Sequence, residues 1–397
     1  STQIDVKTAK AAMFPSLSFS TSQQVVNRPY QETSSRVSGN EIISSNSKTS
    51  YNGNYGLNAS WTLYNGNKRL KTIQQEKLNN QMAELDVATS ENNIQESIAQ
   101  VYIQILYAAE SVKVNENTLQ VSIAQRDRGQ ELLNAGSIAK SDLAQLEAQV
   151  STDRYQLVTA QATLEDYKLQ LKQLLELDGE NEMNIYLPAL SDENVLAPLP
   201  TKRDVYISAL SLRPEIEASK LNVEASELGI NIAKSSYFPT ISLSAGIGTN
   251  HTSGSDFTFG EQVKNGWNNS IGLSVSVPIF NNRQTKSAVQ KAKLQYETSM
   301  LSLLDEQKAL YKTIESLWLD ANSAQQRYAA ANEKLKSTQI SYELISEQFN
   351  LGMKNTVELL TEKNNLLQAQ QEQLQAKYMA ILNTQLLKFY QGDQLAL

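Results

Sequence analysis

Residue types that could carry out chemistry are few in this chain, and their pattern does not fit catalysis. There is no cysteine, and the single histidine, His251, lies in a stretch rich in glycine and serine, where a solvated surface residue is the ordinary interpretation. We find no paired histidine and acid, no glycine-rich phosphate loop and no nucleophile motif. We therefore expect no enzyme activity, no metal site and no cofactor.

The charged residues of most interest lie in two short stretches with one shared pattern. Each has an asparagine, any residue, a glycine, a few mostly polar residues, and then an acid followed by leucine: Asn134, Gly136, Asp142 and Leu143, and again Asn350, Gly352, Glu358 and Leu359. Glycine permits the left-handed turn between antiparallel helices, so Gly136 and Gly352 predict two hairpin tips. An acid in the first turn of a helix is stabilised by the helix dipole, which by itself explains Asp142 and Glu358.

The two stretches belong to a longer internal repeat. Pro239 follows Pro15 by 224 residues, and Gly352 follows Gly136 by 216 residues. The eight residues that differ fall in a loop between two strands. Strand, strand, long helix and turn therefore occur twice, and the predicted repeats are residues 1–200 and 201–397.

A helical stretch meets an aromatic residue and a proline in both repeats, at Phe14 and Pro15 and at Phe238 and Pro239. Proline fixes φ and stops the helix, and the chain then alternates apolar and small polar residues as a strand does. The segment from Asn27 to Ser50 is polar and predicts a long exposed loop. The predicted strands are about 15–27, 51–64, 239–250 and 267–280.

The alternation is cleanest in the last strand, where Ile271, Leu273 and Val275 alternate with Gly272 and Ser274. Such strands with aromatic residues at their ends are typical of transmembrane barrels, although a soluble sheet with one buried face would show the same alternation. The small polar face suits a water-filled lumen, and no other segment offers an apolar layer to cover the sheet. Four strands cannot close around a lumen, so several chains must combine, and three chains would supply twelve strands.

The helices are unusually long. Two predicted helices, at about 67–133 and 282–349, have apolar or small residues at steps of three and four, which favours coiled-coil packing. At 1.5 Å per residue each helix is roughly 100 Å long. The predicted return helices are about 140–178, 202–237 and 356–390, and the proline-containing equatorial segment 179–200 separates the first two. The second repeat lacks the continuation of its return helix. We expect the tail of such a helix at residues 1–14, with roughly 20 to 40 residues before Ser1.

Composition excludes several classes of partner. The formal net charge is −7 and the pI is near 5.1, so a nucleic-acid partner is not expected. No run of 18 apolar residues occurs, so no membrane-spanning helix is predicted.

A duplicated unit of two strands and a long helical hairpin, with Phe and Pro at the junction, resembles the TolC family of bacterial outer-membrane efflux ducts. Leu212, Arg213, Pro214 and Glu215 form a stretch typical of the second half of that family. The resemblance implies a mixed α and β homotrimer with a twelve-stranded barrel in outer-membrane lipid, continued by a long α-helical barrel in the periplasm. It also implies a periplasmic adaptor and, indirectly, an inner-membrane pump as partners.

The same resemblance implies roles for the tips. In the family, ionic and hydrogen bonds between neighbouring hairpins close the periplasmic entrance, and an acidic ring lines the constriction. The matching residues are Asp142 and Lys354 for the link and Glu358 for the ring. Phe349 stands where some members have Tyr, and Thr361 stands where a second acid can occur.

The function implied is a passive exit duct of a tripartite efflux or type I secretion system, gated at the tips. The alternative is a soluble trimeric coiled-coil scaffold with no transport role. The sequence does not separate export of drugs, proteins or metals, and it does not identify the pump, a lipid anchor or signal peptide before Ser1, or the open or closed state of the tips.

Overall fold

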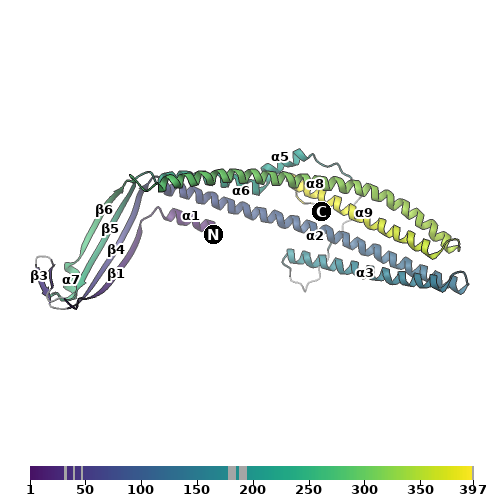
Figure 1. Ribbon diagram of the computed structural model, residues 1–397, viewed down its shortest axis with the longest axis horizontal. Helices are drawn as coiled ribbons and strands as arrows, with labels where there is room; N and C mark the ends of the chain where they lie inside the picture. The colour runs from purple at the N-terminus through teal and green to yellow at the C-terminus, as the bar shows by residue number, and fades with distance from the viewer. Residues whose placement is uncertain (31–33, 39–40, 46–47, 178–184, 187–194, 396–397) are drawn as a thin grey trace. The chain divides into compact units, whose positions relative to one another are not determined.

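The computed structural model describes residues 1–30, 34–38, 41–45, 48–177, 185–186 and 195–395 (Figure 1). The elements in chain order are α1 (Thr2–Ala11), β1 (Ser16–Asn27), β2 (Ser34–Ser38), β3 (Glu41–Ser45), β4 (Thr49–Asn65), α2 (Lys68–Asn134), α3 (Lys140–Leu174), α5 (Lys202–Leu212), α6 (Pro214–Ser235), β5 (Thr240–Thr252), α7 (Phe259–Asn265), β6 (Asn268–Ser276), α8 (Gln284–Asn350) and α9 (Thr356–Gln391).

The chain forms two compact units. The first contains residues 1–84 and 218–303, and the second contains residues 85–217 and 304–397. Each sequence repeat contributes two strands to the four-stranded sheet of the first unit and one helical hairpin to the second unit, so the units cut across the repeats. No helix in the described part of the chain is both long enough and apolar enough to cross a bilayer.

The first unit is built on a four-stranded antiparallel sheet in the order β1-β4-β5-β6. Its register places apolar residues opposite one another, as in Phe19, Leu57 and Ile247. One position along, small polar residues are aligned in the same way, as in Asn58 and Gly246. Since directly opposite residues share a face, the register confirms one apolar face and one face of small polar residues.

The prediction of a loop throughout residues 27–50 was wrong, because β2 pairs with β3 as an antiparallel hairpin. Gly39 and Asn40, the two residues between these strands, are a recognised hairpin signal in a sequence. A polar segment can therefore form a hairpin as well as a loop, and polarity alone does not separate the two.

The prediction of one helix over 202–237 was also wrong. The structure has two helices, α5 and α6, which are separated at Arg213 with φ −75° and ψ 125°. Proline disfavours the helical conformation of the residue before it, so Pro214 interrupts the backbone here.

Two predicted elements end earlier than expected. Helix α3 ends at Leu174 instead of residue 178. Glu176 has a φ of +52°, which a right-handed helix cannot contain. Strand β6 ends at Ser276 instead of residue 280, because Pro278 has no N–H to contribute to a sheet.

Helix α7 was not predicted, although Thr258 and Glu261 form a capping box at its start, a recognised sequence signal. Of the equatorial segment 179–200, residues 179–184 and 187–194 lie outside the described residues.

The two helix-to-strand junctions have the same local geometry. The N–H of Phe14 donates to the carbonyl of Ala11 at 3.0 Å, and the N–H of Phe238 donates to that of Ser235 at 3.1 Å. After each pair of strands the chain then enters a long helix through two consecutive residues with positive φ, at Gly66 and Asn67 and again at Asn282 and Arg283, 216 residues later. The sequence repeat therefore corresponds to repeated backbone conformations.

Among the described residues of the second unit, the helices pack through three apolar clusters. The cluster nearest the tips contains Leu146, Phe349 and Leu359. A second cluster joins α5 and α6 to α8 and α9. Arg213, the residue between α5 and α6, has a side chain that is only 7% exposed. Its guanidinium lies 2.9 Å from oxygens of both Glu96 and Glu215 and 4.1 Å from the centroid of the Tyr390 ring. The break between α5 and α6 is thus held in place by a buried cation that pairs with two carboxylates and lies over the rings of Tyr390 and Phe389.

We predict that Gly66→Ala destabilises the protein more than Gly136→Ala does. Both glycines have positive φ, which costs an L-residue about 1–2 kcal/mol. A Cβ at Gly66 would also lie 2.6 Å from the Ser235 carbonyl oxygen, whereas nothing lies within 4 Å of a Cβ at Gly136. Overpacking should add about 1–3 kcal/mol at Gly66. Denaturant unfolding followed by circular dichroism measures the difference, and equal losses would contradict the close packing at this junction.

Candidate functional site: the helical tips

The two hairpin tips of the second unit are built on the same turn. At the first, the N–H groups of Gly136 and Ser137 donate to the carbonyls of Leu133 and Leu132 at 2.9 and 2.8 Å. At the second, Gly352 and Met353 donate to Phe349 and Gln348 at the same two distances. Gly136 and Gly352 have φ of +74° and +73°. This is the Schellman arrangement, in which a left-handed glycine ends the outgoing helix.

The acids that follow the turns cap the returning helices. Asp142 Oδ2 accepts from the N–H of Ala139 at 3.0 Å at the start of α3. At the start of α9, Glu358 Oε2 accepts from the N–H of Asn355 at 3.3 Å, and Asn355 Oδ1 accepts from the N–H of Glu358 at 2.9 Å. Both acids therefore lie in the first turn of their helices, as the sequence predicts, and each accepts a backbone N–H there.

Glu358 has a second partner, for which the first tip has no equivalent in the sequence. The Lys354 ammonium lies 2.6 Å from Glu358 Oε1, and residue 138, one repeat earlier, is isoleucine. The hydrogen bond from Lys354, followed by that from the Asn355 backbone, lowers the pKa of Glu358 below its ordinary value. Both side chains of the pair are partly exposed, so its contribution to stability is small.

Within this chain Lys354 is paired with Glu358, while Asp142 is bound to its own helix terminus. Asp142, Lys354 and Glu358 nevertheless line one surface depression of about 370 Å³, together with Phe349 and Gly352. The structure thus brings the predicted tip residues together at one place.

Phe349 has a different environment from the charged residues. Its side chain is 2% exposed and packs with Leu146 and Leu359, so it forms part of the tip core. Thr361, where a second ring acid can occur in the family, is exposed and donates to the Val357 carbonyl of its own helix at 2.8 Å.

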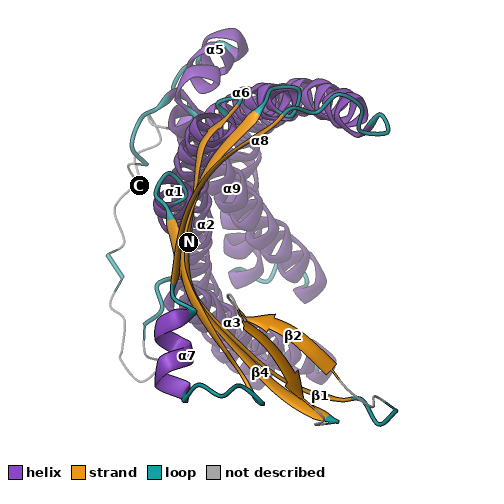
Figure 2. Ribbon diagram, turned by 90° about the vertical axis from the view of Figure 1, so that its left-hand side faces the viewer, coloured by secondary structure: helices purple, strands orange, loops and turns teal. Residues whose placement is uncertain are grey.

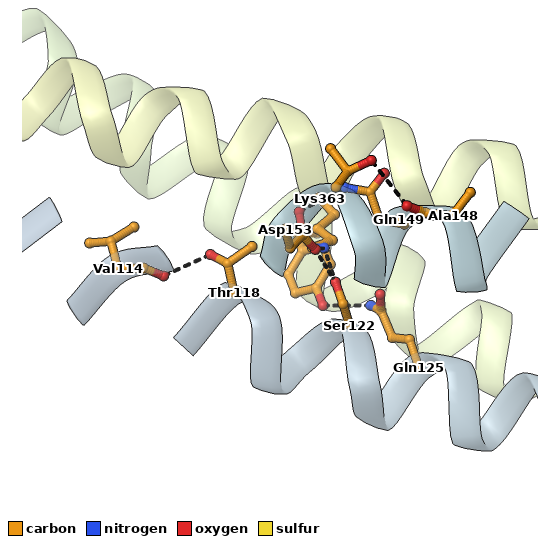
Figure 3. A network of polar contacts seen from close by, with 10 residues as sticks. Val114, Thr118, Ser122, Gln125, Ala148, Gln149, Asp153 and Lys363 are labelled. Atoms are coloured by element: carbon orange, nitrogen blue, oxygen red, sulfur yellow. Dashed lines mark hydrogen bonds and ion pairs between the residues drawn. The ribbon is translucent and has the colours of Figure 1, made fainter. Parts of the chain in front are cut away.

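A buried polar network lies further along the same helices (Figure 3). Lys363 of α9 and Asp153 of α3 form an ion pair in which each side chain is 3% exposed, and both hydrogen-bond Ser122 of α2. Gln149 donates to the other Asp153 oxygen at 2.9 Å. Burial lowers the pKa of Lys363, and the hydrogen bond and charge of Asp153 oppose that shift.

This network was not predicted from the sequence, although the heptad pattern contains a signal for it. The apolar positions of α3 step from Leu146 to Val150 and then to Leu157, and Asp153 occupies the position that the heptad pattern leaves open. Lys363 likewise lies between Leu359 and Leu366 at a core spacing. Charged residues at core positions of two helices predict a buried pair, but which helices meet is a tertiary property.

A family model described as Outer membrane efflux protein matches residues 1–176 and 205–392 of this chain. The chain belongs to the outer membrane efflux protein family. It is therefore an outer-membrane protein, and the soluble scaffold that the sequence left as an alternative does not fit this family.

Individual relatives agree with this assignment. The chain is 24% identical over 294 residues to the outer membrane efflux protein BepC of Brucella suis, covering 74% of this chain and 61% of BepC. It is also 24% identical over 294 residues to the outer membrane protein TolC of Escherichia coli, covering 72% of this chain and 58% of TolC. The chain thus spans about three fifths of the length of these two relatives.

The fold matches a solved structure of CusC with a TM-score of 0.81, at 19% identity, covering 99% of this chain and 86% of that one. A likeness at this identity establishes the fold, which is the mixed α and β architecture expected from the repeat.

We predict that Lys363→Met lowers the free energy of unfolding by about 3–5 kcal/mol, because it leaves the Asp153 carboxylate buried without its cation. The double variant Asp153→Leu with Lys363→Met should recover most of that loss, since an apolar pair of similar size needs no charge compensation. Urea unfolding of the detergent-solubilised protein measures both.

The matched control is Lys308→Met, because Lys308 forms an exposed ion pair with Asp305 at 3.6 Å. Its effect should stay below about 0.5 kcal/mol. If Lys363→Met were no more destabilising than this control, the buried pair would not support the packing of α3 against α9.

Proposed function

We propose that three copies of this chain form a passive exit duct through the outer membrane, as part of a tripartite efflux or type I secretion system. The observation that carries the proposal is the four-stranded sheet, which has one apolar face and one face of small polar residues. An apolar face toward lipid and a small polar face toward water are what a channel-forming barrel requires.

The edges of the sheet support assembly. β1 and β6 are the terminal strands of the described sheet, and each has a strand neighbour on one side. A sheet within a bilayer must be closed, because unpaired N–H and C=O groups have no water to bind there. Pairing of β1 with β6 of the next copy closes the ring, and three copies supply twelve strands.

The similar proteins support transport as the task. BepC is named an efflux protein, and the solved CusC structure is described in terms of transmembrane channel formation. We infer that a periplasmic adaptor and an inner-membrane pump act with this chain, and that the pump supplies the driving force because no catalytic group is expected in the duct. Drugs, proteins and metal ions are all candidate substrates.

We further propose that the tips are the gate. Asp142 of one hairpin and Lys354 of its neighbour would form the closing link, with Glu358 contributing an acidic ring. The partly exposed positions of these side chains around one depression support this, because they leave the charges accessible to a neighbouring hairpin. Opening then requires the adaptor to separate the tips.

Conductance in planar bilayers tests both parts of the proposal. The detergent-purified wild type should insert and give small, flickering currents, and the triple variant Asp142→Ala, Lys354→Ala and Glu358→Ala should give currents several-fold larger. The double variant Asp305→Ala and Lys308→Ala removes an exposed ion pair outside the tips and should resemble the wild type.

The outcomes separate the two claims. Unchanged currents in the triple variant would eliminate an electrostatic gate at the tips while leaving the duct intact. Failure of every protein to insert, despite correct folding, would argue against the duct itself.

A further inference from the structure

Helix α7 lies on the convex side of the main sheet, against the end of β5 (Figure 2). Two hydrogen bonds attach it there. Thr249 Oγ1 donates to the Val263 carbonyl at 2.6 Å, and the Thr252 N–H donates to Gln262 Oε1 at 2.8 Å. Because Thr249 follows Ile247 by two residues, its side chain lies on the apolar face of the sheet. Helix α7 therefore covers part of that face.

The part that α7 covers is the end of the strand where the apolar face becomes polar. The apolar residues of β5 on this face run from Ile241 to Ile247, and Thr249 and His251 follow. Six residue steps of about 3.3 Å, tilted by about 40°, span only about 15 Å of a lipid-facing band that is typically about 25 Å tall. The apolar run of β5 is therefore shorter than such a band.

Aromatic rings surround His251 at the polar end of β5, next to α7. The His251 ring stacks on Tyr55, with centroids 5.8 Å apart, and meets the edge of Phe259 at 5.0 Å. It also lies 5.2 Å from the Tyr51 ring. Opposite His251 is Gly53, where a Cβ would lie 2.2 Å from the imidazole, so the ring occupies the space that a side chain would take.

The helix and its flanks present aromatic side chains outward. Phe257, Phe259 and Trp267 are 37%, 58% and 57% exposed. Tyr51, whose ring meets the His251 ring that Phe259 also contacts, is 40% exposed. We call these four residues the rim patch. Aromatic side chains are enriched at the level of lipid headgroups, where an apolar ring and a polar edge are both accommodated.

We propose that the rim patch is seated in the interfacial zone of the lipid bilayer, so that α7 extends the lipid-facing surface beyond the end of the strands. The inference rests on the proposed function, because it needs the sheet to lie in a membrane. Continuity with the apolar face of the sheet selects lipid as the occupant, since the patch begins directly where the apolar residues of β5 end.

Tryptophan fluorescence tests the proposal, because the chain has only Trp61, Trp267 and Trp318. Trp61 lies on the apolar face of the sheet, and Trp267 belongs to the rim patch. Single-tryptophan proteins, made by changing the other two to Phe, are reconstituted in dioleoylphosphatidylcholine vesicles with lipids brominated at shallow or deep acyl positions. The Trp267 signal should be quenched at least twofold more by shallow than by deep bromines, and acrylamide should quench it little.

The control for aqueous exposure is Tyr155→Trp in a background with all three tryptophans changed to Phe. Tyr155 lies on α3 in the helical unit and is 71% exposed. Its tryptophan should respond to acrylamide and not to brominated lipid. If removal of Trp61 impairs folding, two proteins that keep Trp61 are compared instead. One carries Trp318→Phe alone and the other carries both Trp267→Phe and Trp318→Phe, and the difference between their signals is the contribution of Trp267.

Three results would overturn the inference. In the first, Trp267 responds to the quenchers as the tryptophan of Tyr155→Trp does, which would place the rim patch in water. In the second, Trp267 is shielded from both acrylamide and brominated lipid, which would place the patch against another copy of the chain or another protein. Equal quenching by shallow and deep bromines would also contradict an interfacial depth. Trp61 tests the proposed function separately, because it lies on the apolar face of the sheet. If brominated lipid quenches Trp61, the proposed function stands even when the inference about the rim patch fails. If it does not quench Trp61, the sheet is not inserted in the bilayer.

Discussion

Backbone hydrogen bonding of the sheet is the constraint on which the rest of the structure depends. The register that pairs Phe19 with Leu57 and Ile247 also aligns the small polar residues, so a shift of one strand by one residue would exchange the two faces of that strand. The terminal strands β1 and β6 still need partners, and in a bilayer water cannot provide them. The assembly of several chains proposed above would supply these partners.

The helical unit meets a different requirement. Its helices pack through narrow apolar seams, and small and polar residues occupy several core positions. At one such position the pair of Lys363 and Asp153 joins α9 to α3, and Ser122 adds α2. A buried ion pair adds little net stability over an apolar pair, but it penalises any helix arrangement that separates the charges. The network therefore favours one alignment of the helices behind the tips.

The tips combine strict backbone geometry with adaptable side chains. Gly136 and Gly352 occupy equivalent left-handed positions, and Asp142 and Glu358 cap equivalent helices. Lys354 of the second tip corresponds to Ile138 of the first, so the two tips share a turn but differ in charge at this position.

Local spacing in the chain was enough to predict the repeat, the two-faced strands, the long helices and the hairpin turns, because each depends on periodicity or on the backbone limits of Gly and Pro. Even some errors had local causes, as Pro214 and the capping box of α7 show. Tertiary packing was needed to establish that Phe349 is a core residue, that Lys354 pairs with Glu358, and that Lys363 meets Asp153, 210 residues away. Those contacts depend on which helix faces lie together and at what register, and periodicity along one helix carries no information about its partner.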